Sequence, residues 1–465
     1  MITRTRFGPA SFYRRALSLA IPVMLQLLLQ NLVSLIDNFM VAGLGNIKMS
    51  GVNVANQLIF VLFVALMTLM SAGGIFMSQF NGTKNAEGMQ QAFRFKLFTS
   101  LTLVGIAGVL VLFIPEHLLG ILVNTNRERD PIIAEGRSYI SLIVWTFVPL
   151  AISHSIGSSL REIGRVKPPL VITVAATLVN TFFNWVLIYG NLGAPRMEVK
   201  GAAIATIIAR SVEMIIFLVY IRQAKPLFFV QLRRLFAVNF SLFVRILSKS
   251  GFIFLSEMTW VMTETIMTAV YNGRGGSEII SGMAAGWAIA NLFFLVFNGI
   301  HTSIGVIVGG TLGRNDLDTA QTEARWLKTG SFFLGATVAT LQALSIMLIP
   351  IVFGNLTEDA RAVTRHMILV IACYMPVWTY LNAQFANARA GGDAIMGVWV
   401  DVTVNLFLFL PALFLLAALT DLGPITIFAI IKTTDIVKVL IASWQLRTGR
   451  WIRNLTHEHE PEAIA

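Results

Sequence analysis

Three acidic residues lie inside apolar stretches long enough to cross a membrane, with no basic residue within two helical turns. They are Asp37, Glu257 and Glu264. A carboxylate inside a membrane is costly, and such residues usually mark the path of an ion or a substrate. Removal from water favours the protonated form of an acid, so we expect protonation near neutral pH. The chemistry predicted for these residues is reversible binding of a proton or another cation.

Asp37 shares one helical face with other polar side chains. Gln26, Gln30, Ser34 and Asp37 follow one another at steps of four, four and three residues. At about 100° per residue these steps keep them within an arc of about 80°. Such a stripe faces the protein interior. Hydrogen bonding between helices would also explain the glutamines and the serine, whereas the carboxylate indicates a function in transport.

Polar residues also line one face of a later apolar stretch, which carries Thr173, Thr177, Asn180 and Asn184. On the next stretch, Thr206 lies one turn before Arg210. Threonine and asparagine oxygens with one carboxylate are the hard ligands that Na⁺ prefers, so Asp37, Asn180 and Asn184 form a candidate Na⁺ site. The same groups could instead form a hydrogen-bond network around a protonatable acid.

The second half of the chain has its own polar faces. Glu257 and Glu264 are seven residues apart and therefore near one face, as are Asn291 and Asn298, and a further face carries Tyr374, Trp378, Asn382 and Phe385. Aromatic faces bind flat or cationic organic molecules. The candidates for a substrate cavity are Gln26, Gln30, Ser34, Glu264, Asn291, Tyr374, Trp378 and Asn382. Ordinary helix packing would explain any single aromatic residue.

The remaining acids of the apolar stretches have basic neighbours in sequence. Glu213 lies three residues from Arg210, and Asp435 lies three residues from both Lys432 and Lys438. These spacings predict ion pairs within one helix, and hence a structural role. Asp401 has no such neighbour and is compatible with either the end of a helix or a cavity.

The elements that position these residues are membrane helices. Of 465 residues, 56% are hydrophobic and only 13% charged, whereas soluble proteins carry about 25% charged residues. Apolar stretches of about 20 residues or more recur along the chain. We expect an all-α polytopic membrane protein with twelve helices, near 16–42, 52–79, 95–122, 134–160, 168–190, 201–221, 243–272, 283–310, 328–353, 364–388, 395–418 and 424–446.

Charge predicts the orientation in the membrane. Lys and Arg are concentrated at both termini and in every second loop, which places both termini in the cytoplasm. The net charge of +11 is explained by this topology and by contact with anionic lipid headgroups, so no nucleic-acid partner is expected. The single Cys373 excludes an internal disulfide framework and a multi-thiolate metal site. The N-terminal stretch has no cleavage signal and is interpreted as the first span.

The sequence repeats internally at an offset of about 230 residues. Arg15 aligns with Arg245, Gly43 with Gly273, and the Lys84–Asn85 pair with Arg314–Asn315. We therefore expect two six-helix lobes, 1–221 and 243–446, related by a pseudo-twofold axis along the membrane normal. The basic and aromatic linker 222–242 is predicted to be an amphipathic segment on the cytoplasmic membrane face. The tail 447–465 is predicted to be cytoplasmic, and its polar end 456–465, with His457 and His459, is predicted to be solvated.

Four segments resemble the multidrug and toxic compound extrusion family, bacterial type. They are IPVMLQLLLQNLVSLIDNFMVAGLG, LREIGRVKPP, LVNTFFNWVLIYGNLGAP and ANARAGGD. The resemblance covers nearly the whole chain. It implies a cation-coupled exporter of small organic, often cationic and amphipathic, compounds in the inner membrane, without a cofactor, coupled to H⁺ or Na⁺; we expect a monomer.

The resemblance also assigns roles to residues. The family's first-span acid corresponds to Asp37, its fifth-span polar pair to Asn180 and Asn184, its sixth-span threonine to Thr206, and its seventh-span glutamate to Glu257. Many members have an aspartate where this chain has Asn184. One branch has a tenth-span aspartate, whose place is taken here by Trp378 or Thr379. The site in the first lobe is therefore favoured over one in the second.

The predicted mechanism is drug:cation antiport by alternating access, with Pro22 as a hinge because proline removes a helical hydrogen bond. No phosphate-binding GxxxxGK[ST] loop is present, so an ion gradient is the expected energy source. One alternative is a lipid-linked saccharide flippase, which would need more basic residues inside its cavity than Arg210, Lys432 and Lys438. Another is an intramembrane enzyme, but His154 and His301 are isolated, so an enzyme is not expected.

Overall fold

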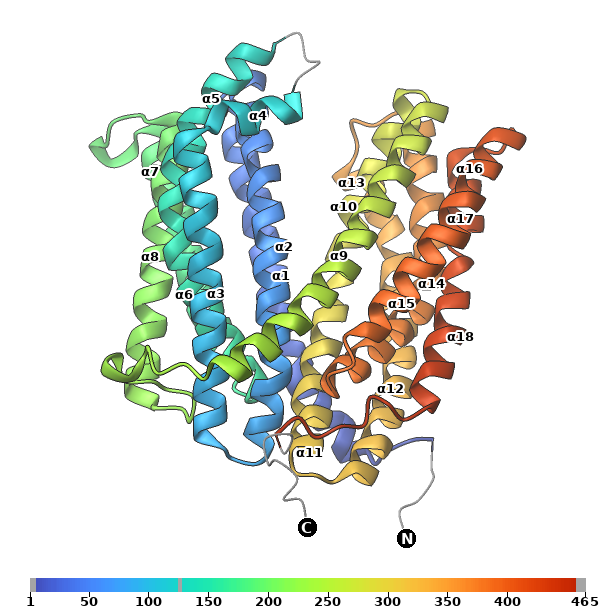
Figure 1. Cartoon of the computed structure of the whole chain (residues 1–465). Coiled ribbons are helices and arrows are strands. Elements are labelled where there is room, and N and C mark those ends of the chain that lie inside the picture. The colour runs from blue at the N-terminus through green and yellow to red at the C-terminus, as the bar shows by residue number, and fades with distance from the viewer. Residues whose placement is uncertain (1–5, 124–127, 457–465) are drawn as a thin grey trace, which may run out of the picture. The chain divides into compact units, whose positions relative to one another are not determined.

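A computed structural model describes residues 6–123 and 128–456, and every regular element in that part of the chain is helical (Figure 1). The first half contains α1 (Ala10–Ala42), α2 (Asn46–Gly82), α3 (Ala86–Phe113), α4 (Pro115–Val123), α5 (Arg129–Ile143), α6 (Phe147–Glu162), α7 (Lys167–Tyr189) and α8 (Glu198–Ala224). The second half contains α9 (Phe240–Arg274), α10 (Ser277–Ile304), α11 (Gly310–Gly313), α12 (Leu317–Leu344), α13 (Ile349–Val352), α14 (Glu358–Ala390), α15 (Ile395–Val404), α16 (Leu410–Leu419), α17 (Pro424–Ile431) and α18 (Thr434–Arg447).

Helices occupy all twelve predicted positions, which confirms the all-α membrane fold. Ten helical segments of the described chain are long and apolar enough to cross a membrane. The other two positions hold α9 and the α17–α18 pair. Two predicted spans are interrupted. The third ends at Phe113 and resumes as α4 at Pro115, because proline starts a helix readily but does not continue one. The twelfth is interrupted at Lys432 and Thr433.

The turns that open α3 and α12 have the same construction. Asn85 and Asp316 are the N-caps, and their side chains accept hydrogen bonds from the backbone N–H of Gly88 and Thr319. The residue before each cap, Lys84 or Asn315, has a left-handed backbone with φ near +60°. The internal repeat is therefore confirmed at this turn, but Lys84 corresponds to Asn315, one residue later than the sequence alignment predicts.

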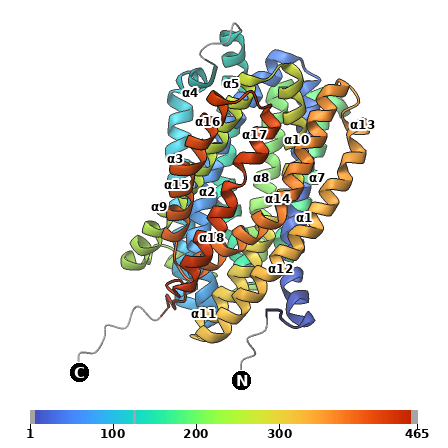
Figure 2. The same cartoon turned by 90° about the vertical axis from the view of Figure 1, so that its right-hand side faces the viewer.

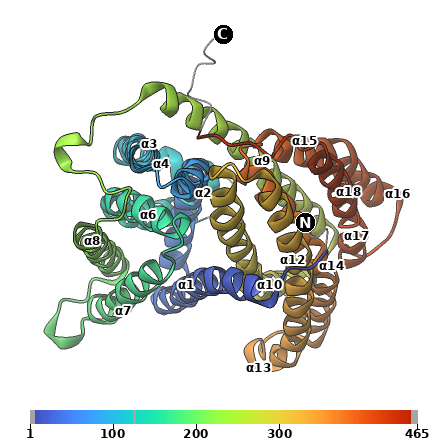
Figure 3. The same cartoon turned by 90° about the horizontal axis from the view of Figure 1, so that it is seen from below.

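The chain divides into two compact units. The N-terminal unit comprises 25–77 and 84–247, and the C-terminal unit comprises 1–24, 78–83 and 248–465. Viewed end-on, α7 and α8 lie side by side in the N-terminal unit (Figure 3). In the C-terminal unit, α10 and α12 both run along α14 (Figure 2). The boundary crosses α1 between Met24 and Leu25, two residues after Pro22, which lies inside the continuous helix.

The N-terminal unit contains a buried ion pair. Lys96 of α3 is 0% exposed, and its ammonium group contacts the Glu162 carboxylate and donates to Ser158 Oγ at 3.2 Å. Glycines on α2 make room for the pair. A Cβ on Gly73 would lie 2.6 Å from Lys96 Cγ, and one on Gly74 would meet the Glu162 carboxylate. A long charged side chain is tolerated here because its partner and its space are both provided.

The C-terminal unit buries the amide of Gln79, which belongs to the last turn of α2. Its Nε2 donates to Ala390 O at 2.8 Å and Arg453 O at 3.2 Å, and its Oε1 accepts from Leu455 N at 2.7 Å. Trp451 is buried as well. The first part of the tail is therefore packed into this unit up to residue 456. The residues 457–465, with His457 and His459, lie outside the described residues, so the predicted solvation of that end stays a prediction.

The segment between α8 and α9 is largely non-helical within the N-terminal unit. Its one regular element is a short 3-10 turn, Leu232–Arg234. Phe228 is buried, with its ring 5.3 Å from that of Phe93 on α3, and Arg94 donates to Arg234 O at 2.9 Å. These contacts tie the predicted amphipathic linker to the start of α3.

Candidate cation and substrate site

Helices α1, α2, α5, α7 and α8 of the N-terminal unit enclose a cavity of about 250 Å³. Its polar lining comes mainly from three of them, with Gln30, Ser34, Asp37 and Asn38 on α1, Thr173, Thr177, Asn180 and Asn184 on α7, and Thr206, Arg210 and Glu213 on α8. The polar stripes predicted on separate stretches thus face one common space. A cavity of this polarity can hold water, a cation or the charged end of a small molecule.

Asp37 contacts amides rather than a basic side chain within this cavity. Asn184 Nδ2 donates to Asp37 Oδ1 at 2.7 Å, and also to Asn180 Oδ1 at 3.3 Å. Asn180 Nδ2 in turn donates to Thr206 Oγ1 at 3.4 Å. The Asn180 amide atom nearest Asp37 lies 2.9 Å from Asp37 Oδ2. The structure therefore brings together the four residues that the family resemblance assigned to the first-lobe site.

A second chain of hydrogen bonds borders the cavity. Gln26 Nε2 donates to Thr173 Oγ1 at 2.9 Å, and Thr173 Oγ1 donates to Glu213 Oε1 at 3.2 Å. Arg210 then contacts Glu213 Oε2 at 2.8 Å, which confirms the ion pair predicted from their spacing. This pair was not predicted to share a cavity with Asp37. Arg210 and Glu213 follow Thr206 by four and seven residues on α8, and this helical spacing is the signal that indicates a common face.

Other lining residues were missed altogether. Asn38, Asn56 and Tyr139 also face the cavity. Asn38 follows Asp37 directly and lies about 100° away around the helix, so a stripe at helical spacing omits it. Asn56 and Tyr139 are single polar residues in apolar stretches and carry no pattern of their own.

The second-lobe acids are not unpaired, which corrects the sequence-based expectation. Glu257 Oε1 contacts Arg389 at 2.9 Å, and Glu264 Oε1 contacts Lys432 at 2.5 Å. Arg389 lies on α14 and Lys432 lies between α17 and α18, both far away in sequence, so a search within two turns of one helix could not find them. Glu257 therefore lies in an ion pair, and its assignment as a coupling residue stays a prediction.

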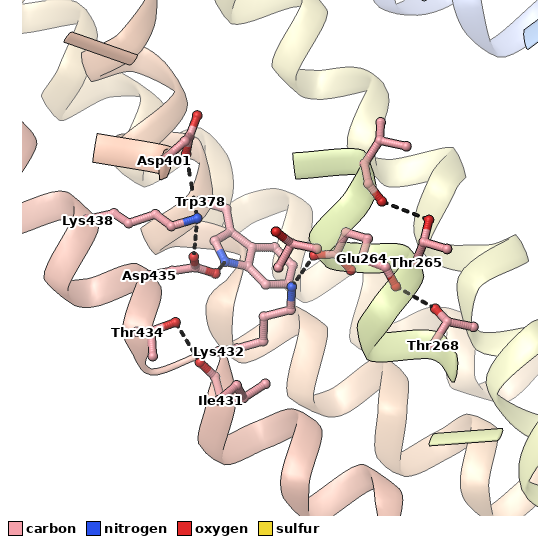
Figure 4. A network of polar contacts seen from close by, with 12 residues as sticks. Glu264, Thr265, Thr268, Trp378, Asp401, Ile431, Lys432, Thr434, Asp435 and Lys438 are labelled. Carbon is pink, nitrogen blue, oxygen red and sulfur yellow. Dashed lines mark hydrogen bonds and ion pairs between the residues drawn. The ribbon is translucent and has the colours of Figure 1, made fainter. Parts of the chain in front are cut away.

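Lys432 and Lys438 belong to one polar network in the C-terminal unit (Figure 4). Lys438 contacts Asp435 Oδ1 at 3.3 Å, as its spacing predicted, and Asp401 Oδ1 at 3.6 Å. Lys432, the other predicted partner of Asp435, points instead to Glu264. Trp378 Nε1 donates to Asp435 Oδ2 at 2.8 Å. Asp401, left open by the sequence, is buried and also accepts from Ser256 at 2.5 Å.

The other predicted cavity residues of the second half are spread over two helices. Tyr374 and Trp378 stack on α14 with ring centroids 5.9 Å apart, and the Tyr374 hydroxyl donates to Ala429 O at 2.8 Å. Asn382 is half-buried on the same helix, and Asn291 is exposed on α10. Within 6–123 and 128–456, no group of three His, Cys, Asp or Glu residues could hold a metal ion.

Comparisons with known proteins agree with this architecture. The family model described as MatE matches residues 22–186. A probable multidrug resistance protein, YoeA of Bacillus subtilis, is 23% identical over 91% of this chain and 90% of its own length. The multidrug resistance protein MdtK of Yersinia pseudotuberculosis is 23% identical over 78% of each chain.

A solved structure shares the fold. It is a crystal structure of a mutant of the Vibrio cholerae MATE transporter VcmN, and it covers 95% of this chain and 99% of its own with a TM-score of 0.83. Sequence identity is 16%, so the likeness concerns the arrangement of the helices.

Proposed function

Because this chain belongs to the multidrug and toxic compound extrusion family of membrane transporters, we propose that it exports a range of small organic compounds, mostly cationic and amphipathic, in exchange for H⁺ or Na⁺. The observation that carries the proposal is the contact of Asp37 with Asn180 and Asn184 inside a polar cavity. Neutral amides orient this carboxylate without neutralising its charge, so it can bind a transported cation.

A proton fits the arrangement of the amides. The Asn180 amide atom that faces Asp37 Oδ2 lies 2.9 Å from it, and hydrogen bonding favours nitrogen at that position. With its nitrogen there, Asn180 donates to an ionised Asp37. If the amide turned so that its oxygen faced Asp37, it would accept from a protonated Asp37. Loading and unloading of a proton would therefore reorient Asn180 and alter its bond to Thr206.

Sodium is the second candidate for the same place. Asn184 Oδ1 is buried without a hydrogen-bond partner among the described residues. With a carboxylate oxygen of Asp37 and the Asn180 oxygen, it would supply the oxygen ligands that a hard cation needs. A single carboxylate gives the site little negative charge, so the proton is the coupling ion we favour.

The loaded site is connected to a helix that can bend. Asp37 and Pro22 share α1, and Pro22 lies two residues before the boundary between the two units. Since Pro22 removes one backbone hydrogen bond, α1 can bend there at low cost. We propose that alternating access uses this bend, with both termini in the cytoplasm of an inner-membrane monomer surrounded by lipid.

The basic residues favour cationic over anionic cargo. Arg210 is paired with Glu213, Lys432 with Glu264, and Lys438 with Asp435. A lipid-linked saccharide flippase would need such charges free to bind a pyrophosphate. Because the relatives are membrane transport proteins, we propose transport rather than an enzymatic role.

The test is transport by purified protein in vesicles with pH and Na⁺ gradients imposed separately. Asp37→Asn should abolish gradient-driven efflux of a fluorescent organic cation while leaving the melting temperature nearly unchanged, because asparagine keeps the shape but loses the exchangeable charge. Asp130→Asn, at an exposed acid outside the cavity, is the matched control and should transport normally. Undiminished efflux by Asp37→Asn would overturn the proposal.

A further inference from the structure

The ammonium group of Lys432 lies in an aromatic cage inside the C-terminal unit. Its Nζ is 5.7 Å from the ring centroid of Trp378, 5.5 Å from that of Phe409 and 5.6 Å from that of Phe428. Glu264 supplies the carboxylate, with Oε1 at 2.5 Å. Three ring faces and one carboxylate are the arrangement by which proteins bind organic ammonium ions. Figure 4 shows Lys432 reaching from the α17 side toward Glu264 on α9, beside Trp378.

The cage holds more hydrogen-bonding capacity than Lys432 uses. Glu264 Oε2 and the Tyr271 hydroxyl are both buried without a hydrogen-bond partner among the described residues. Tyr271 is 1% exposed, lies seven residues from Glu264 on α9, and packs against Phe428 at 6.2 Å. Unsatisfied buried acceptors are rare and call for an explanation. Glu264 Oε2 would accept from a protonated amine, which carries several N–H donors, whereas a quaternary ammonium ion has none.

Lys432 also lies where the helix is interrupted. It follows Ile431, the last residue of α17, and precedes α18, which begins at Thr434. Hydrogen bonds from Asp435 N to Lys432 O and from Ile436 N to Thr433 O span three residues instead of four. No proline or glycine occurs at this interruption. The backbone that carries Lys432 therefore departs from regular α-helix and is held by the tighter three-residue bonds.

From these contacts we infer that the cage formed by Glu264, Trp378, Phe409 and Phe428 is a binding site for a protonated alkylamine, and that Lys432 is its built-in occupant. An amine can bind in the cage only by displacing the ammonium group of Lys432. The site therefore binds only those cations that compete successfully with this lysine. The inference rests on the proposed function for its substrate class, but not for coupling at Asp37, which lies in the other unit.

The test removes the Lys432 ammonium group by mutation and supplies a free alkylammonium ion in its place. Lys432→Ala deletes the equivalent of n-propylammonium, so the purified variant should bind n-propylammonium at least about tenfold more tightly than the wild type in calorimetric titration. Binding should raise its melting temperature. The gain should vanish in Lys432→Ala/Glu264→Gln, and 1-propanol, which has similar size but no charge, should not reproduce it.

Lys438→Ala is the matched control, because Lys438 is equally buried and ion-paired but has no aromatic cage. An equal gain in Lys438→Ala, a gain that survives Glu264→Gln, or equal binding of 1-propanol would overturn the inference. If Lys432→Ala does not fold alone, the readout is the yield of folded protein from cells grown with n-propylammonium. The yield of folded protein should rise for Lys432→Ala but not for the wild type or Lys438→Ala. If the yield of Lys432→Ala does not rise, the proposed binding site is contradicted. Binding needs no gradient, so a failure here is distinct from a failure of Asp37→Asn to block transport.

Discussion

Asn184 on α7 donates a hydrogen bond of 2.7 Å to Oδ1 of Asp37 on α1. The neighbour of the cavity's unpaired acid is therefore a neutral amide. An amide orients the carboxylate without adding charge, so the site carries one negative charge to offer a cation. The identity of residue 184 should consequently influence which cation the site accepts.

Asn184→Asp tests this relationship. It places a second carboxylate against Asp37, and two such groups in one site resist joint ionisation unless a cation lies between them. Two carboxylates with an amide oxygen also suit Na⁺ better than one. We expect the ratio of Na⁺-driven to H⁺-driven efflux to rise by about tenfold, equivalent to about 1.4 kcal/mol. The measurement is vesicle transport with the two gradients applied separately.

The control for this change is Asn191→Asp. Asn191 belongs to the loop after α7 and bonds to Trp185 O outside the cavity. The Asn191→Asp substitution introduces the same negative charge in the same region of the chain. An unchanged ratio in Asn184→Asp, or an equal change in both variants, would contradict the assignment of residue 184 to the coupling site.

Thr173→Val tests the chain from Gln26 to Glu213. Valine nearly preserves the shape of threonine but removes the hydroxyl that accepts from Gln26 and donates to Glu213. Unpaired buried polar groups cost about 1–3 kcal/mol. We expect a lower melting temperature by thermal denaturation in detergent. Thr177→Val, one turn later on the same cavity wall, should have a clearly smaller effect, and equal losses in the two variants would argue against the chain.

Lys96→Met tests the buried ion pair. Methionine fills similar space but removes the ammonium group that contacts the Glu162 carboxylate, which should cost about 3–5 kcal/mol. The double variant Lys96→Met/Glu162→Gln should recover most of that loss, because it removes the carboxylate charge together with the ammonium group. Melting temperatures of the two single variants and the double variant form the cycle.

A half-exposed pair gives the comparison for this cycle. Lys48 contacts Glu198 with side chains 29% and 34% exposed. Lys48→Met should cost only about 0–1 kcal/mol, as usual for pairs in contact with solvent. For the buried pair, the contradicting outcome is a double variant whose loss of stability equals the sum of the losses of Lys96→Met and Glu162→Gln. Such additivity would show that the two residues are not energetically coupled.

The sequence predicts the helices well because hydropathy alone determines where an apolar chain can span a membrane. It also predicts the Arg210–Glu213 and Asp435–Lys438 pairs, since helical spacing is a local property. The partners of Glu257 and Glu264 could not be predicted from the sequence. Their basic partners lie more than a hundred residues away in the chain, and only tertiary packing decides that Lys432 contacts Glu264 rather than Asp435.

The candidate site was predicted in parts. The polar stripes on α1 and α7 were visible as periodic patterns, and the family resemblance grouped Asp37 with Asn180, Asn184 and Thr206. The alternative orientations of the Asn180 amide depend on interatomic distances and have no signature in sequence. The break at Lys432 was equally hidden, because no glycine or proline marks it.

The buried amide of Gln79 has a consequence for biosynthesis. Its partners are Ala390, Arg453 and Leu455, more than three hundred residues later in the chain. When a ribosome has made the first half of the protein, this side chain has none of them, and contacts so distant in sequence form late. The C-terminal unit can therefore close only near the end of translation, and nascent chains stalled before residue 451 should present an accessible Gln79 to the quality-control machinery.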